Sequence, residues 1–300
     1  MPPRRRPIVP PTFSAHSPIA TNTPTPSFHL TLADRRALEH IDRLFAIVGA
    51  GAARSRSPQL HNAAYRAAGV PALYLPLAGQ GLADLLAAPV QQALTAIGLP
   101  LRGLTVGAPF KELALRLAAD ASPRARQAGA ANLLLRQGDA WYADTTDPEG
   151  VLLPLADHQV ALGDREVAVI GCGGAGRAIA AALRDAGARV TLVNRSRTRG
   201  EFAAQLLGLP CQPLDLLRES QYTLIVHATP CADALPLDPT RLAAGTVLVD
   251  LVYRELPTPL VRAASDRGHL VIDGHAVLAA EVSEQYQRMI GTPLPTAHGR

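Results

Sequence analysis

Lysine is almost absent from this sequence: of its 29 lysine and arginine residues, only Lys111 is a lysine. Arginine can supply a positive charge at most positions, but its guanidinium stays protonated, whereas the pKa of a lysine ammonium responds to its surroundings. Lys111 follows the apolar run 101–106 and a Gly-Ala-Pro-Phe segment. This pattern predicts a buried strand and then a turn, with Lys111 at the lip of a cleft. Position alone equally allows a solvated lysine.

Other absences exclude whole classes of protein. The three cysteines, Cys172, Cys211 and Cys231, lack the spacing of a metal site, and their odd number favours thiols in a reducing compartment. We therefore predict a cytoplasmic protein without a bound metal. No apolar run is long and charge-free enough to cross a bilayer. No basic patch is interleaved with aromatic residues, so neither nucleic acid nor a membrane is a predicted partner.

The chain divides into a leader and a folded body. Residues 1–40 are predicted to form a disordered or loosely attached leader, because the first 28 or so are rich in proline, serine and threonine and lack acidic residues. Residues 32–44 have the pattern of a short amphipathic helix. The body then alternates strands with helices, which predicts an α/β fold with parallel sheets in both halves.

Several elements of the body can be placed from local patterns. Ser57-Pro58 is expected to open a helix, with Ser57 as its N-cap. Residues 133–143 are expected to form a β-hairpin around Gly138-Asp139. The remaining strands expected in this half are 45–48, 72–77 and 101–106.

A glycine-rich loop marks the second half of the chain. The buried strand expected at 167–170 runs directly into the loop, and a helix follows from Arg177. In this context glycines let the backbone approach a pyrophosphate at a helix N-terminus. The loop residues predicted to bind the cofactor are Gly171, Cys172, Gly173, Gly174, Ala175 and Gly176.

The end of the next strand indicates which dinucleotide binds. NAD-binding sequences usually carry an acidic residue there to hold the ribose hydroxyls. Here the strand ends in 194–199, Asn-Arg-Ser-Arg-Thr-Arg, without an acid. Arginines suit a 2′-phosphate through charge-assisted hydrogen bonds, so NADP is the predicted cofactor, with Asn194, Arg195, Ser196 and Arg199 around it. The alternative is a solvated basic loop.

Several short motifs occur in a fixed order along the chain. They are Ser55-Arg56-Ser57-Pro58 with His61-Asn62, Pro109-Phe110-Lys111, Gly129-Ala130-Ala131-Asn132, Thr146-Asp147, the glycine loop, Asn194-Arg195-Ser196, Asp250-Leu251-Val252-Tyr253 and Asp273-Gly274. The ordered set resembles the shikimate dehydrogenase family, over about residues 45–289.

This resemblance implies a fold and an activity. The fold is an N-terminal α/β substrate domain (41–148) and a C-terminal Rossmann NADP-binding domain (149–275), with a cleft between them and a helix at 276–290 that packs back onto the first. The activity is an oxidoreductase reaction on a CH–OH group, the reversible reduction of 3-dehydroshikimate to shikimate. This step belongs to chorismate and aromatic amino acid biosynthesis. A monomer or homodimer is expected.

The resemblance also assigns roles to residues. Lys111 and Asp147 form the catalytic pair, in which the ammonium stabilises charge on the ketone oxygen and relays a proton. Leu251 and Gly274 join the cofactor site. The residues implied to bind substrate are Ser55, Ser57, Thr105, Gly107, Asn132, Asp147, Tyr253 and Glu281. Four of them have a structural alternative: a helix cap for Asp147 and Ser57, a turn for Asn132 and a core position for Tyr253.

The chain departs from the family pattern in the substrate pocket. Six residues differ from the usual family residue, which follows each in parentheses: Thr105 (Asn), Gly107 (Thr), Thr145 (Asn), Glu281 (Gln), His227 (Asn) and Arg54 (His). Gly107 opens space that could admit the extra hydroxyl of quinate, and Glu281 could favour a ring that carries an amine. The sequence therefore leaves three alternatives to shikimate dehydrogenase: a quinate dehydrogenase, an aminoshikimate dehydrogenase, or a nucleotide-binding relative with reduced catalysis.

Overall fold

The computed structural model describes residues 40–295 except 80 and 234. Apart from His40, the predicted leader lies outside the described residues, as do residues 32–39 of the helix expected there. The last two residues of that expected helix, Arg43 and Leu44, are instead in strand β1 (Arg43–Val48). They pair with β2 on one side, and Leu44 also pairs with β3 on the other, so sheet pairing overrides the local helical pattern.

The first half of the body contains a six-stranded sheet of order β2-β1-β3-β5-β6-β4. Its other strands are β2 (Ala72–Leu77), β3 (Leu101–Val106), β4 (Asp120–Ala121), β5 (Leu133–Gln137) and β6 (Ala140–Asp144). β1 is parallel to β2 and β3, but β5 is antiparallel to both β3 and β6. The sheet of this half is therefore mixed, with parallel pairs at β1 and antiparallel pairs at β5. A two-residue turn cannot make the crossover that parallel strands require, so the hairpin that we expected introduces antiparallel pairs.

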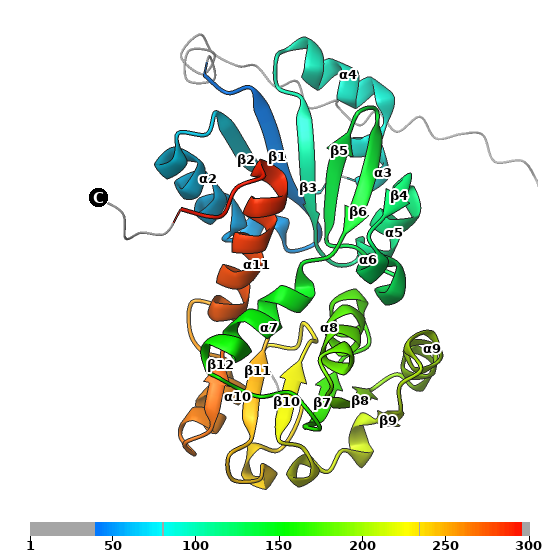
Figure 1. The fold of residues 1–300 in the computed structure, drawn as a ribbon, viewed down its shortest axis with the longest axis vertical. Coiled ribbons are helices and arrows are strands. Elements are labelled where there is room, and N and C mark those ends of the chain that lie inside the picture. The colour runs from blue at the N-terminus through cyan, green and yellow to red at the C-terminus, as the bar shows by residue number, and fades with distance from the viewer. Residues whose placement is uncertain (1–39, 80, 234, 296–300) are drawn as a thin grey trace, which may run out of the picture. The chain divides into compact units, whose positions relative to one another are not determined.

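Helices cover both faces of this first sheet (Figure 1). The helical elements of this half are η1 (Ala52–Arg54), α2 (Ser57–Ala68), α3 (Leu82–Leu86), α4 (Ala88–Ala96), α5 (Lys111–Leu117) and α6 (Pro123–Ala128). The prediction of Ser57 as an N-cap was wrong by one position. Arg56 is the N-cap and contributes no side-chain hydrogen bond, while Ser57 is the first helical residue. The Ser57 hydroxyl is thus not used as a helix cap.

The second sheet is entirely parallel and has the order β12-β11-β10-β7-β8-β9. Its strands are β7 (Glu166–Ile170), β8 (Arg189–Asn194), β9 (Cys211–Pro213), β10 (Leu224–His227), β11 (Val247–Asp250) and β12 (Leu270–Ile272). The strand order reverses between β7 and β10. In open α/β sheets, ligands bind at such a switch point, beyond the carboxyl ends of the strands.

Both faces of the second sheet are buried under helices. Val167 and Val169 of β7 belong to one apolar cluster, and Ala168 and Ile170 belong to another on the opposite face. The helical elements of this half are α7 (Asp147–Asp157), α8 (Gly174–Asp185), α9 (Arg197–Leu207), η2 (Leu214–Leu216), η3 (Glu219–Gln221), η4 (Pro239–Arg241), α10 (Pro259–Ser265) and α11 (Gly274–Ile290). No helix among the described residues is long and apolar enough to cross a membrane.

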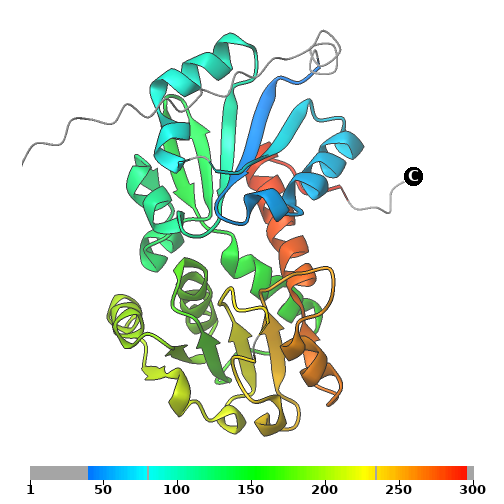
Figure 2. The same ribbon diagram turned by 180° about the vertical axis from the view of Figure 1, so that it is seen from behind.

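Two helices join the sheets. α7 leads from β6 towards β7, and α11 runs from the end of β12 alongside α7 to reach α2 (Figures 1 and 2). In the first sheet's core, Tyr286 of α11 contacts Tyr65 of α2 at a ring-centroid distance of 5.6 Å. In the second sheet's core, Val277 of α11 packs with Val151 of α7. The helices α7 and α11 therefore form a junction between the two halves, and α11 packs into the core of each.

Candidate active site

Lys111 and Asp147 form an ion pair at this junction. Lys111 is the first residue of α5, Asp147 is the first residue of α7, and Lys111 Nζ lies 2.6 Å from Asp147 Oδ1. The Asp147 side chain is 3% exposed and that of Lys111 is 18% exposed. Thr145 Oγ1 donates to the second oxygen, Asp147 Oδ2, at 3.2 Å. The Asp147 carboxylate is thus committed to Lys111 and Thr145, while Thr146 occupies the N-cap position of α7.

Asn132 lies beside this pair. Because β5 and β6 are antiparallel, the residue before β5 returns next to the residues after β6. Asn132 Oδ1 accepts a hydrogen bond from the Thr146 backbone N–H at 2.8 Å, and Asn132 Nδ2 lies 3.1 Å from Thr146 Oγ1. The Asn132 side chain therefore holds the residue next to Asp147.

Two serines and a tyrosine meet nearby from distant parts of the sequence. Ser55 Oγ donates to Ser57 Oγ at 3.1 Å, and the Tyr253 hydroxyl donates to Ser55 Oγ at 3.4 Å. Ser57 is buried, whereas Ser55 and Tyr253 are half-buried. The loop after β11 thus brings a phenol to the start of α2, and the three hydroxyls form one polar group.

Glu281 reaches the same region from α11. It packs against Gly150 of α7, where a Cβ would lie 2.8 Å from Glu281 Cγ and 3.0 Å from Glu281 Oε1. Burial of the Glu281 carboxyl and the negative charge of Asp147 raise its pKa to about 8, against the opposing effect of Lys111. Glu281 is therefore mainly protonated at neutral pH.

Thr105 and Gly107 differ in how far their surroundings constrain them. The Thr105 hydroxyl is hydrogen-bonded to the Tyr74 hydroxyl in the interior. Gly107 donates its backbone N–H to Val48 O at 2.8 Å, and a Cβ there would meet nothing closer than 3.6 Å. A Cβ would thus fit at 107, so glycine is not a backbone requirement there.

His227, at the end of β10, is a buried structural residue. Its Nδ1 lies 2.9 Å from Asp250 Oδ1 at the end of β11, and its Nε2 bonds Thr229 Oγ1. Asp250 Oδ2 also accepts from Thr258 Oγ1 at 2.7 Å. His227 therefore ties together the loops that follow β10 and β11.

The glycine loop is shaped by several separate constraints. Gly171 has φ +111°, and a Cβ on Gly176 would lie 1.8 Å from Gly171 O, so each position requires glycine. A Cβ on Gly173, by contrast, would meet nothing within 4 Å. Gly173 is the N-cap of α8 and makes no side-chain cap, so the helix N-terminus presents backbone N–H groups at an open position. These residues fit a dinucleotide pyrophosphate.

Gly174 brings this loop against the ion pair. A Cβ at Gly174 would lie 2.8 Å from Ala130 Cβ and 3.2 Å from Lys111 Cβ. The glycine is therefore needed for contact with the first domain as much as for a cofactor. The glycine loop thus lies close against the side chain of Lys111.

The β8–α9 turn has the features expected around a 2′-phosphate. Asn194 Oδ1 accepts from Cys172 N–H at 3.1 Å, which links the turn to the glycine loop, and Ser196 caps α9. Arg195 and Arg199 are exposed, and neither pairs with an acidic side chain among the described residues. The positive charge of this turn is thus free to meet an anionic group.

Two further predicted cofactor residues lie at the ends of β11 and β12. The Leu251 N–H donates to His227 O at 3.0 Å. A Cβ on Gly274 would lie 2.4 Å from the carbonyl atoms of Val252, so only glycine allows α11 to start beside this loop.

Some residues that build the site were not identified from the sequence. Arg177 of α8 is 2% exposed and donates to Ala128 O, Cys172 O and the Glu112 carboxylate. Gln285 of α11 is 4% exposed and reaches Thr146. An arginine within the small apolar residues of α8, and a glutamine one turn after Glu281, were the available signals.

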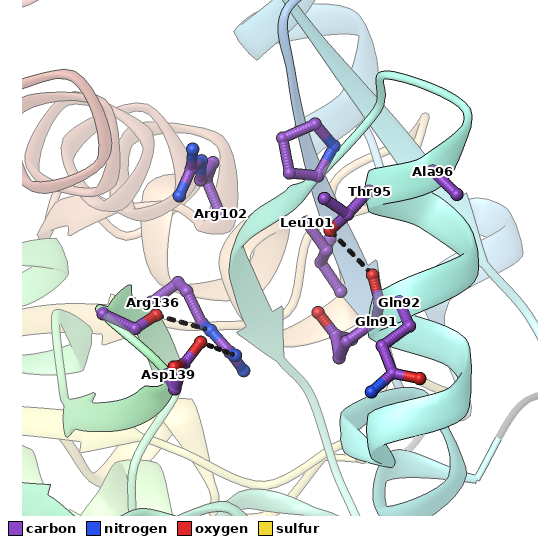
Figure 3. A pocket seen from close by; sticks show the side chains of 10 residues that line it. Gln91, Gln92, Thr95, Ala96, Leu101, Arg102, Arg136 and Asp139 are labelled. Atoms are coloured by element: carbon purple, nitrogen blue, oxygen red, sulfur yellow. Dashed lines mark hydrogen bonds and ion pairs between the residues drawn. The ribbon is translucent and has the colours of Figure 1, made fainter.

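A surface hollow lies elsewhere, between α4 and the ends of β3 and β5 (Figure 3). Its lining includes Gln91, Thr95, Arg102, Arg136 and Asp139, none of them a candidate site residue. Arg136 donates to Gly138 O and pairs with Asp139, as the dashed lines show. The hollow is thus separate from the Lys111–Asp147 site.

A Rossmann sheet with a glycine loop that lies against Lys111 of a Lys–Asp ion pair, next to another α/β domain, defines the class of two-domain, nicotinamide-nucleotide-dependent oxidoreductases. The chain is 34% identical, over 84% of its own length and 88% of the relative's, to shikimate dehydrogenase (NADP(+)) of Syntrophobacter fumaroxidans. It is 36% identical to the protein of that name from Symbiobacterium thermophilum, over 79% and 85% of the two chains. The chain belongs to the shikimate dehydrogenase family.

Family models and solved structures agree with this membership. The model described as shikimate dehydrogenase substrate binding domain matches residues 47–134, and that of the acetohydroxy acid isomeroreductase NADPH-binding domain matches residues 161–226. The crystal structure of shikimate 5-dehydrogenase from Thermus thermophilus in complex with NADP(H) and shikimate has a TM-score of 0.74 and 31% identity, covering 84% of this chain and 95% of that one. The predicted two-domain α/β fold is confirmed.

Proposed function

We propose that this protein is an NADP-dependent shikimate dehydrogenase, which reversibly reduces 3-dehydroshikimate to shikimate. The observation that carries the proposal is the Lys111–Asp147 ion pair in contact with the glycine loop at Gly174. Relatives of this name at 34% and 36% identity, over most of both chains, support the substrate and the cofactor. The reaction would serve chorismate and aromatic amino acid biosynthesis.

Lys111 performs the proton chemistry in this proposal. NADPH supplies a hydride when bound, and reduction of a ketone by hydride places negative charge on the carbonyl oxygen. The Lys111 ammonium stabilises that oxygen and donates the proton that completes the alcohol. Asp147, 2.6 Å away, orients the ammonium. In the oxidation direction Lys111 takes the proton from the alcohol.

The remaining pocket residues bind the ring acid. Ser55, Ser57 and Tyr253 form a group of hydroxyls suited to a carboxylate, because each can donate to an anionic oxygen. Asn132 and Asp147 suit ring hydroxyls. Thr105 acts indirectly, since its hydroxyl is bonded to Tyr74.

Gly107 and Glu281 decide between related ring acids. Gly107 leaves space for a substituent, as in quinate. Glu281, protonated at neutral pH, can donate a hydrogen bond to a ring hydroxyl, and in its ionised form it would pair with a ring amine.

The cofactor would be held by the glycine loop and the β8–α9 turn. Backbone N–H groups at the start of α8, beside Gly173, meet the pyrophosphate, and Arg195 and Arg199 meet the 2′-phosphate. Leu251 and Gly274 would complete the cofactor site, next to the loop that carries Tyr253. We place the domain boundaries at 41–148 and 149–275, with helix 276–290 returning to the first domain.

The proposal is tested by NADP⁺ reduction with shikimate, quinate and aminoshikimate at equal concentrations. Shikimate should give the highest kcat/KM. A faster reaction with quinate would transfer the assignment to quinate dehydrogenase, as expected if the space at Gly107 dominates, and one with aminoshikimate would do the same on account of Glu281. NADPH binding without turnover of any ring acid would indicate a nucleotide-binding relative.

We also propose a cellular location, partners and an assembly state for the protein. A cytoplasmic location is supported by Cys172 and Cys211, which are thiols and not a disulfide. The partners proposed are the ring acid and NADP, without nucleic acid or membrane, and the assembly is a monomer or homodimer.

A further inference from the structure

A chain of polar side chains crosses the interior between α2, α11 and the turn before α7. His61 and Gln285 are 0% and 4% exposed. His61 Nε2 lies 3.3 Å from Gln285 Oε1, and Gln285 Nε2 donates to Thr146 Oγ1 at 3.2 Å. Thr146 is in turn bonded to Asn132. Buried polar groups are costly unless paired, so this chain fixes the orientation of its members.

The hydrogen-bond directions follow from the ends of the chain. Gln285 Nε2 donates to a hydroxyl, so its Oε1 is the acceptor, and His61 must carry its proton on Nε2. His61 Nδ1 then needs no proton, and it has no partner among the described residues. Burial lowers the pKa of His61 to about 4, so its ring is neutral at neutral pH. With its single proton on Nε2, His61 donates to Gln285 Oε1, which matches the donation from Gln285 Nε2 to Thr146.

His61 is itself held in place. Its ring stacks on Tyr74 at a centroid distance of 4.3 Å and an interplanar angle of 5°. The Tyr74 backbone exchanges two hydrogen bonds of 2.8 Å with the Asn62 side chain, and the Tyr74 hydroxyl bonds Thr105. The donor that orients Gln285 therefore cannot turn away without unstacking an aromatic pair.

At the other end, Thr146 uses its full hydrogen-bonding capacity. Its Oγ1 accepts from Gln285 Nε2 and from Asn132 Nδ2, which leaves its proton for Asn132 Oδ1 at 3.3 Å. Asn132 Oδ1 also accepts the Thr146 backbone N–H. The carbonyl oxygen of Asn132 is thus fully engaged, whereas one N–H of its Nδ2 has no acceptor among the described residues.

We propose that Gln285 is a positioning residue for substrate binding. It donates to the Thr146 hydroxyl, and together with the Thr146 backbone N–H it holds the Asn132 carboxamide so that Asn132 offers the substrate an N–H and not its carbonyl oxygen. The inference rests on the proposed function, in which Asn132 binds the ring acid. It also defines the group recognised: a ring hydroxyl that accepts from Asn132 Nδ2 and donates to the Asp147 carboxylate. An ammonium cannot accept a hydrogen bond, so a ring amine is disfavoured at this position.

The test compares pairs of variants that change one side chain each. Gln285→Met and Thr146→Val remove the donor and the hydroxyl with little change of volume. Thr146→Ser retains the hydroxyl, and Gln287→Met makes the same substitution as the first at an exposed position of α11. KM and kcat for shikimate, the NADPH dissociation constant and the thermal unfolding midpoint are measured for each.

Gln285→Met and Thr146→Val should each raise KM about tenfold. Their kcat should change less than about threefold and NADPH binding should not change, because Lys111 and the glycine loop are untouched. Thr146→Ser and Gln287→Met should resemble the wild type. The KM of the double variant Gln285→Met/Thr146→Val should be no higher than that of the single variant with the higher KM, since both substitutions act through one chain of hydrogen bonds.

Unchanged KM in folded Gln285→Met and Thr146→Val proteins would overturn the inference, as would additive effects in the double variant. If Gln285→Met does not fold, the comparison of Thr146→Val with Thr146→Ser decides alone. Failure of the wild type to oxidise any ring acid would instead contradict the proposed function and, with it, this inference.

Discussion

At the scale of single residues, Lys111 is set apart by chemistry and not by charge. The chain uses arginine at every other basic position, yet the residue paired with the buried Asp147 is a lysine. An arginine would keep the ion pair but could not release a proton. A comparison of lysine with arginine at position 111 can therefore distinguish electrostatic stabilisation from proton transfer.

Replacement of Lys111 should therefore act on kcat. We expect Lys111→Ala to lower kcat by about 10²- to 10⁴-fold, the usual range for loss of a general acid, with NADPH affinity changed less than about threefold. Lys111→Arg should recover little of the loss. Steady-state kinetics and fluorescence titration of NADPH measure both, and a Lys111→Arg enzyme with wild-type kcat would show that charge alone suffices.

Glu281 should give the protein a pH-dependent stability. Its native pKa of about 8 lies above the ordinary value of 4.5, so the folded state holds a proton that the unfolded chain releases between these values. The stabilisation is complete below about pH 4.5 and is lost as the pH rises through about 8. We expect the unfolding midpoint of the wild type to fall from pH 5 to 8.5, relative to that of Glu281→Gln.

The comparison with Glu281→Gln cancels the effect of other titrating groups on the unfolding midpoint, because the two proteins differ only at residue 281. Parallel midpoints across this pH range would mean that Glu281 is ionised in the folded protein. In that case an ionised Glu281 would favour a substrate with an amine.

Residues with distinctive chemistry were predictable from the sequence, and residues that support them were not. Lys111, Asp147 and Asn132 could be proposed from ordered motifs, whose residue types follow from the reaction. Gln285 looked like any polar helical residue, because its burial depends on how α11 packs against α7. Arg177 could not be recognised for the same reason: its acceptors Ala128 and Cys172 are set by tertiary structure.

At the scale of elements, the β8–α9 turn should determine the choice of nucleotide. The Arg195→Ser/Arg199→Ser variant should lose at least about tenfold in kcat/KM for NADPH and little for NADH, because charge-assisted contacts to the 2′-phosphate are removed. Arg189→Ser is a suitable control. It removes an arginine from the opposite end of β8, where Arg189 pairs with Asp164 and Glu166. An unchanged preference for NADPH would exclude this turn as the phosphate site.

Helices and strands were predicted well where the apolar pattern was long. They were predicted poorly where pairing between strands or hydrogen bonds at a helix start set the boundary. β7, α8 and β8 follow from apolar runs around a glycine loop. The segment 43–44 became strand because β2 and β3 flank it, and Ser57 lost its capping role because α2 begins one residue earlier than expected. Such boundaries depend on hydrogen bonds that local sequence does not encode.

At the scale of the whole described molecule, Arg177 links the two domains. Its guanidinium, in the helix that follows the glycine loop, bonds the carbonyls of Ala128 and Cys172 and the carboxylate of Glu112, the neighbour of Lys111. Arg177→Met should lower the free energy of unfolding by about 3 kcal/mol, because buried carbonyls lose their donors.

Urea unfolding measures this change. Glu112→Gln is the matched control and should cost less than about 1 kcal/mol, since the Glu112 side chain is 53% exposed. Equal losses in the two variants would show that the Arg177–Glu112 ion pair, and not the bonds to the backbone carbonyls, stabilises the junction.

The position of Lys111 in an ion pair also allows its side chain to serve as a spectroscopic probe of the site. With a single lysine in the sequence, reductive methylation with ¹³C-formaldehyde would label the amino terminus and one side chain, and that side chain lies in the proposed reaction centre. In most proteins the same reagent produces a crowded spectrum from many surface amines. Here a single side-chain resonance, beside that of the amino terminus, would report on Lys111 and its contact with Asp147 as each ligand is added, without any engineered substitution.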